Sequence, residues 1–138
     1  MFFAKKEDQS KETNLIKIGA LLIHAAKIDE NYSNEEKEII KQTLLSLGAN
    51  KNNLDTLIYK AKHSEEDANQ ILDFTKEIKS LEETDKIKII KSLWKIIYSN
   101  KDADIYETNL MRRLAGLLYI DSKIMGDIKE EIKKESLK

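Results

Sequence analysis

The sequence predicts an all-α fold, a single compact bundle of about seven helices with an internal pseudo-two-fold repeat. Proline is absent and glycine occurs only four times in 138 residues, so few residues interrupt a helix. Apolar residues recur at the helical spacing along the chain. The order of elements in the second half of the chain also resembles the order in the first half. With 41% hydrophobic residues, the chain is long enough to bury one core.

The clearest pattern is a helical hairpin between Leu93 and Leu118. Its first helix is apolar nearly all round, which is typical of a buried helix and predicts that Trp94 lies in the core. Residues 99–103 then have no periodicity and form a polar break. Asp104 with Glu107 predicts a capping box at the start of the second helix, in which apolar residues again recur at helical spacing.

A fainter copy of this hairpin lies nearer the N-terminus, and one constant shift along the sequence aligns the two copies. Ser33 with Glu36 predicts the equivalent capping box. The aligned pairs are Leu22 with Leu93, Ala25 with Ile96, Ala26 with Ile97, Asp29 with Asn100, Glu36 with Glu107, Ile39 with Leu110, Ile40 with Met111 and Leu47 with Leu118. Two units at so long a period predict a pseudo-symmetric globule instead of a solenoid.

The first elements follow from polarity and from helix-ending residues. Residues 1–12 are polar after Phe2 and Phe3, which predicts a flexible N-terminal segment before a helical domain at 13–138. The apolar pattern predicts the first helix at 13–28. The second helix is expected to begin near Asn34 and to end at Gly48, because glycine readily adopts the left-handed conformation that closes a helix.

The remaining helices are placed by their capping residues. A short third helix is expected to begin at Leu54, and Ser64 with Asp67 predicts a capping box that opens a fourth helix through Ile78. Thr84-Asp85 opens the fifth helix, and the sixth begins near Ile105. Asp121 is predicted to cap the seventh helix, in which Ile124, Ile128 and Ile132 face inward.

Composition excludes several classes of function. The net charge is −1 with lysine and glutamate interspersed, which predicts no nucleic-acid binding. Cysteine is absent, and the sequence has no pattern of a nucleophile with a base, no phosphate-binding glycine loop and no HExxH motif. We therefore expect a protein that is not an enzyme. No segment has the length and polarity of a transmembrane helix or a signal peptide, so the expected location is the cytoplasm.

Oxygen-bearing side chains gather in the two polar breaks, which makes a divalent cation such as calcium or magnesium the one candidate cofactor. The candidate metal ligands are Asp29, Asn31, Ser33 and Glu36 in the first break and Asp102, Asp104 and Glu107 in the second. The glycine and the bidentate glutamate of an EF-hand are missing from both, so any binding is expected to be weak. The alternative is that Glu36 and Glu107 serve only as helix caps.

The two arginines of the chain, Arg112 and Arg113, are adjacent. The planar guanidinium suits bidentate pairing with a carboxylate better than a lysine ammonium does. We expect one of the two to hold an acidic residue of a neighbouring helix or turn, and the other to be solvated.

The segment from Leu93 to Leu118 resembles the second half of the tellurite-resistance TerB-like family, in a small bacterial branch. The residues that carry the resemblance are Leu93, Trp94, Tyr98, Tyr106, Glu107, Leu110, Arg112, Arg113, Ala115, Leu117 and Leu118. The first copy is similar to the Asp-Gly loop of the same family at Ala25, Ala26, Asp29, Tyr32, Ser33 and Glu36. The resemblance covers about residues 13–135 of this sequence.

This resemblance implies a compact helical bundle, a role in bacterial stress or tellurite resistance, and similarity to the N-terminal domain of membrane-anchored DnaJ-like co-chaperones. It also implies cation binding by the acidic turns, although Asp29-Glu30 and Asn100-Lys101 stand where the family has Asp-Gly pairs. The leading interpretation is a non-enzymatic interaction or scaffold protein with a protein partner. The alternative is a weak divalent-cation sensor that uses the acidic turns.

Overall fold

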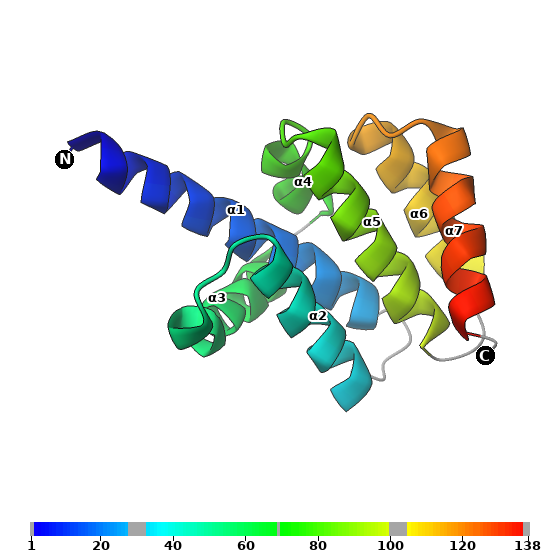
Figure 1. Ribbon diagram of the computed structural model, residues 1–138, viewed down its shortest axis with the longest axis horizontal. Helices are drawn as coiled ribbons and strands as arrows, with labels where there is room; N and C mark the ends of the chain where they lie inside the picture. Colours follow the sequence, from blue (N-terminus) through cyan, green and yellow to red (C-terminus); the bar gives the residue numbers. More distant parts are fainter. Residues whose placement is uncertain (1, 28–32, 69, 100–104, 137–138) are drawn as a thin grey trace.

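The computed structural model describes residues 2–27, 33–68, 70–99 and 105–136, without the side chains of 2–10, 105–107 and 136. This part of the chain forms helices and no strand, which confirms the all-α prediction (Figure 1). The helices are α1 (Phe2–Lys27), α2 (Asn34–Ser46), the 3₁₀-helix η1 (Lys51–Asn53), α3 (Leu54–Asp67), α4 (Leu72–Ile78), α5 (Glu83–Tyr98), α6 (Ile105–Leu117) and α7 (Ser122–Ser136).

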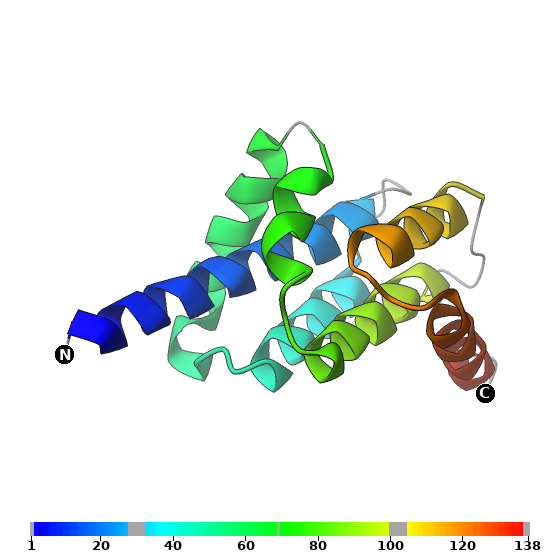
Figure 2. The same cartoon turned by 90° about the horizontal axis from the view of Figure 1, so that it is seen from above.

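Helices α1 and α5 hold the bundle together. Helix α1 packs against α2, α3, α4 and α5, and α5 also packs against α2 and α7. Helix α6 packs on α7 at the end of the molecule away from the start of α1. In both views the first turns of α1 project beyond the other helices (Figures 1 and 2).

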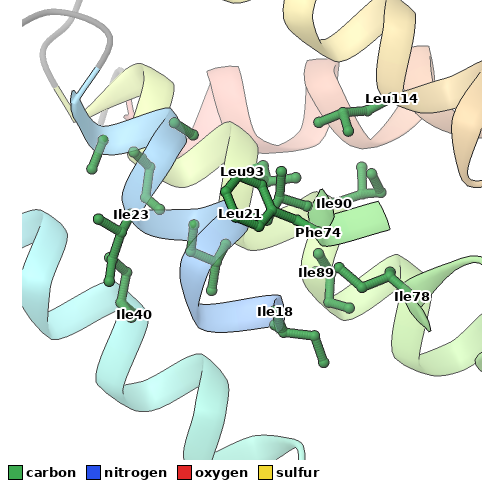
Figure 3. Close-up of a cluster of buried hydrophobic side chains, with 14 of the residues drawn as sticks. Ile18, Leu21, Ile23, Ile40, Phe74, Ile78, Ile89, Ile90, Leu93 and Leu114 are labelled. Carbon is green, nitrogen blue, oxygen red and sulfur yellow. The ribbon is translucent and has the colours of Figure 1, made fainter. Parts of the chain in front are cut away.

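The core lies where α1, α4 and α5 meet. Figure 3 shows Leu21 of α1, Phe74 of α4, and Ile90 and Leu93 of α5 gathered together, and all four are buried. Trp94 is 2% exposed, as predicted for a residue of the buried helix. Burial of so many apolar side chains is the main source of stability for a domain of this size.

The internal repeat appears in the helix boundaries themselves. Helices α2 and α6 each have 13 residues. The shift that aligns Leu22 with Leu93 carries both ends of α2 onto the corresponding ends of α6. The same shift carries Lys27, at the end of α1, onto Tyr98 at the end of α5. The prediction of two related halves is therefore confirmed, with α4 placed between them.

The turns that follow α2 and α6 are closed by equivalent backbone hydrogen bonds. The N–H of Ala49 donates to the carbonyl of Leu44 at 2.9 Å, and the N–H of Ile120 donates to the carbonyl of Ala115 at 2.9 Å. This is the hydrogen bond by which a left-handed residue closes a helix. The left-handed residues lie one position earlier in each half, Gly48 with φ +104° and Tyr119 with φ +57°.

The starts of the next helices also correspond. Asn50 accepts a hydrogen bond from the N–H of Asn52, and Asp121 accepts one from the N–H of Lys123, both at 2.9 Å. The prediction that Asp121 caps the last helix is confirmed. Ile128 and Ile132 are buried as expected, and Ile124 is half-buried.

Two predicted boundaries differ from the structure. Helix α1 begins at Phe2 instead of near Thr13, because the lysines and glutamates of this segment favour a helix although they give it no apolar periodicity. The flexibility of residues 1–12 stays a prediction. The Ser64–Asp67 capping box is wrong, since both residues lie in the last turn of α3. The Ser64 hydroxyl accepts a hydrogen bond from Lys17 of α1 at 3.3 Å instead.

Gly19 allows α1 and α3 to approach closely, because a Cβ atom at this position would lie 2.9 Å from the Cβ of Ala61. We expect Gly19→Ala to lower the free energy of unfolding by about 1–2 kcal/mol, since overpacking outweighs the gain in helix propensity. Gly116→Ala is the matched control, because nothing lies within 4 Å of its added Cβ. Urea unfolding of both variants checks this, and equal stabilities would show that α3 moves aside without cost.

Candidate functional site

The first acidic break leads into α2 through the predicted capping box. The N–H of Glu36 donates to Ser33 Oγ at 3.2 Å, and the N–H of Ser33 donates to Glu36 Oε1 at 2.9 Å. The Glu36 side chain is only 1% exposed, although it is a carboxylate. The capping-box prediction is confirmed, and it accounts for Ser33 and for one oxygen of Glu36 without a metal ion. The other two candidate ligands of this break, Asp29 and Asn31, lie outside the described residues.

The ligands predicted in the second break cannot be placed. Asp102 and Asp104 lie outside the described residues, as does the side chain of Glu107, so the second capping box stays a prediction. Among the side chains that are described, no group of three or more His, Asp or Glu residues could hold a metal ion. Cation binding by the two breaks therefore stays a prediction.

The expected ion pair of the adjacent arginines stays a prediction, because the side chains of Asp102, Asp104 and Glu107 in the turn before α6 lie outside the described residues. Arg112 and Arg113 are both exposed, and the ion pairs of this part of the chain involve neither of them. The face of α6 that is turned to the core carries Met111 and Leu114, which are both buried. An exposed arginine without a carboxylate is available to an external anion.

Tyr119 is a surface feature that the sequence patterns did not single out. It follows α6 in the left-handed conformation, with φ +57°, and its side chain is 74% exposed. This conformation costs a residue other than glycine about 1–2 kcal/mol. The equivalent residue of the first half is Gly48, which adopts a positive φ without that cost. The second half therefore keeps an exposed aromatic ring in a position that suits glycine.

Apolar and basic groups surround Tyr119. Leu72 of α4 is 45% exposed, and together with Tyr119 it lines a hollow of about 390 Å³ between α4 and the end of α6. Lys76 and Lys79 line the same hollow, which has no carboxylate among its described lining residues. We call this the Tyr119 surface; it consists of Leu72, Thr75, Lys76, Lys79, Gly116, Leu117 and Tyr119.

A buried lysine supports the turn that carries Tyr119. Lys86 of α5 donates a hydrogen bond to the carbonyl of Leu118 at 3.0 Å. Its Nζ atom also lies 5.8 Å from the centroid of the Tyr119 ring, within the range of a cation–π interaction. Lys86 therefore stabilises both the turn that carries Tyr119 and the position of its ring. Comparison of the two halves position by position would have identified it, because Tyr119 falls on Gly48.

These features define a helical domain of two related halves in which one half carries an exposed aromatic and basic surface. The sequence matches the family model described as "Tellurite resistance protein TerB" over residues 15–130. This match covers most of the chain, and the chain belongs to the TerB family, as the resemblance implied. Curated proteins and solved structures give no match.

No helix in the described part of the chain combines the length and the apolar character that crossing a membrane requires.

The strain at Tyr119 can be measured. We expect Tyr119→Gly to raise the free energy of unfolding by about 0.5–1 kcal/mol, because relief of the left-handed conformation outweighs the lost cation–π contact and the added freedom of the unfolded chain. Gly48→Ala is the matched control and should lower it, since φ there is +104°. Thermal and urea unfolding check both changes. A less stable Tyr119→Gly variant would mean that packing of the ring exceeds its backbone strain.

Proposed function

We propose that this protein is a non-enzymatic, cytoplasmic interaction module of the TerB family that binds a protein partner through the Tyr119 surface. The observation that carries the proposal is that Tyr119 exposes its ring to solvent. Its backbone is held in the left-handed conformation, which glycine would adopt without strain. Backbone strain of this kind gathers at functional positions. Family membership supports a role in tellurite resistance or a related bacterial stress response.

The composition of the surface fits a protein interface. Tyrosine is enriched among the residues that dominate binding energy, because its ring offers a large contact area with few rotatable bonds. Leu72 adds a second exposed apolar side chain beside it. Binding would remove both from water, which is the main driving force of association.

The charges of the surface indicate the chemistry of the partner. Lys76 and Lys79 line the hollow, and its described lining residues include no carboxylate. Complementary potentials steer association and select the partner. The proposed partner segment therefore presents an apolar side chain to Leu72 and Tyr119 and flanks it with aspartate or glutamate.

Site-specific photo-cross-linking tests this proposal in cells. We expect p-benzoylphenylalanine at position 119 to give discrete protein adducts that Leu72→Ser weakens, because the two side chains line one hollow. The same label at Tyr59 is the control, since this tyrosine is 64% exposed but lies on α3. Equal adducts from both positions, or none from 119, would contradict the proposed surface.

The same experiment separates the interaction from the pathway. In cells exposed to tellurite, the adducts at position 119 should increase if the protein acts in tellurite resistance. Adducts that stay unchanged by tellurite would leave the interaction in place and reject that pathway.

The second candidate function is weak divalent-cation sensing at the first acidic break. It is supported by Glu36, whose carboxylate is buried and held in one orientation directly after residues 29–32. The proposed ligands remain Asp29, Asn31, Ser33 and Glu36. The number of charged ligands and the rigidity of the site tune the affinity for calcium, and this break offers few carboxylates and no tight-turn glycine.

Calorimetric titration with calcium and with magnesium tests the cation site. We expect a dissociation constant of about 10⁻⁴–10⁻³ M that Asp29→Asn abolishes, because the number of carboxylates largely determines affinity. Asp55→Asn, an exposed position in α3, is the control. Micromolar binding that survives Asp29→Asn would reject these ligands, and the absence of heat at millimolar metal would leave Ser33 and Glu36 as a helix cap.

A further inference from the structure

A second hollow, the α6–α7 groove, lies between α6 and α7 and has a volume of about 440 Å³. Its walls are apolar, since Trp94, Met111, Ile120 and Met125 line it and all four are buried. Volumes of roughly 300–1,000 Å³ with mostly apolar walls and a few polar groups are typical of sites for small molecules.

The internal repeat explains why this groove is open. Leu44 and Leu45 fill the equivalent positions of the first half, and Leu44 is completely buried. In the second half these positions hold Ala115 and Gly116, which both line the groove. Gly126, on the α7 side, likewise has nothing within 4 Å of an added Cβ. Small residues thus leave space on both sides where the first half is packed.

The charged groups that line the groove are all positive. Arg112 of α6 and Lys129 of α7 both line it, and its described lining residues include no carboxylate. Arg112 makes no ion pair in the part of the chain that the structure describes. Lys129 Nζ lies 5.6 Å from the centroid of the Trp94 ring, so its charge sits directly beside the apolar wall. An anionic group bound beside an apolar group would match this arrangement.

Trp94 adds an unused hydrogen-bond donor. Its indole N–H is buried and has no acceptor among the described residues, although buried donors are nearly always satisfied. The ring stacks on Tyr98 with centroids 5.9 Å apart. Burial, together with the Glu130 carboxylate, raises the pKa of Tyr98, so this phenol brings no charge to the neighbourhood.

We propose that the α6–α7 groove binds a small amphiphilic carboxylate, such as a medium-chain fatty acid. The alkyl chain would lie against Trp94, Met111 and Met125, and the carboxylate would pair with Arg112 and Lys129. The planar guanidinium of arginine suits a carboxylate because it can donate two parallel hydrogen bonds. This inference stands apart from the proposed protein partner, which contacts the Tyr119 surface.

Octanoate is a suitable probe, and Trp94 is the one tryptophan of the chain, so its fluorescence reports directly on the groove. We expect octanoate to change the Trp94 emission with a dissociation constant of about 10⁻⁴–10⁻³ M, as an unoptimised ligand of this size allows. Octanol, which has the same chain length without the charge, should bind at least about tenfold more weakly. No saturable change up to 10 millimolar octanoate (about ten times the weakest expected constant), or equal binding of octanol, would overturn the proposal.

Variants locate the binding. Gly126→Leu adds a side chain to the α7 wall of the groove, where nothing lies within 4 Å of an added Cβ, and should abolish the response. Thermal unfolding checks that the variant keeps its fold. Ala115→Leu is the second filling variant, because it places in α6 the leucine that the first half has at position 44.

Arg112→Gln tests the charged group of the groove. It should weaken the binding of octanoate about tenfold and leave the binding of octanol unchanged, and Arg113→Gln is the control at the neighbouring exposed arginine. Unchanged octanoate binding by both filling variants would place any binding elsewhere and reject this site.

Discussion

The buried face of α1 is the constraint on which the other helices depend. From Ile18 to Ala26 nearly every side chain is buried, and α2, α3, α4 and α5 all pack against α1. Gly19 allows α1 to lie close to Ala61 of α3. A helix that is buried on so many sides has to supply small and large apolar residues in a fixed order, which leaves little freedom for substitution.

A polar contact specifies how α2 and α5 meet within this apolar surrounding. The hydroxyls of Thr43 and Ser92 lie 2.6 Å apart and are both buried. Each hydroxyl also lies within hydrogen-bond distance of the carbonyl four residues earlier in its own helix, at Ile39 and Lys88, and the two hydroxyl protons serve these three contacts in turn. A shift of either helix along the other would break this contact between the buried hydroxyls, so the pair favours one register of α2 on α5.

The sequence predicted what depends on local chemistry. Helical periodicity gave the all-α class and the burial of Trp94, and the Ser33–Glu36 capping box follows from side chains that lie three residues apart. The capping-box prediction at Ser64 was wrong because the same pattern of residues also occurs inside a helix. The Ser64 hydroxyl accepts a hydrogen bond from Lys17 of α1, and such a contact between distant residues cannot be predicted from local spacing. Tyr119 was missed for a related reason, since a single aromatic residue carries no periodic signal. Both hollows depend on distances between helices, which spacing along the chain does not determine.

The projecting start of α1 has a practical consequence for how this molecule can be held. Ten residues of helix span about 15 Å, and the first turns of α1 point away from the end at which α6 and α7 lie (Figure 1). A tether or a rigid label fixed at Phe2 would therefore lie away from the other helices. Both hollows of the second half would stay open to solvent on a molecule immobilised in this way, in a known orientation.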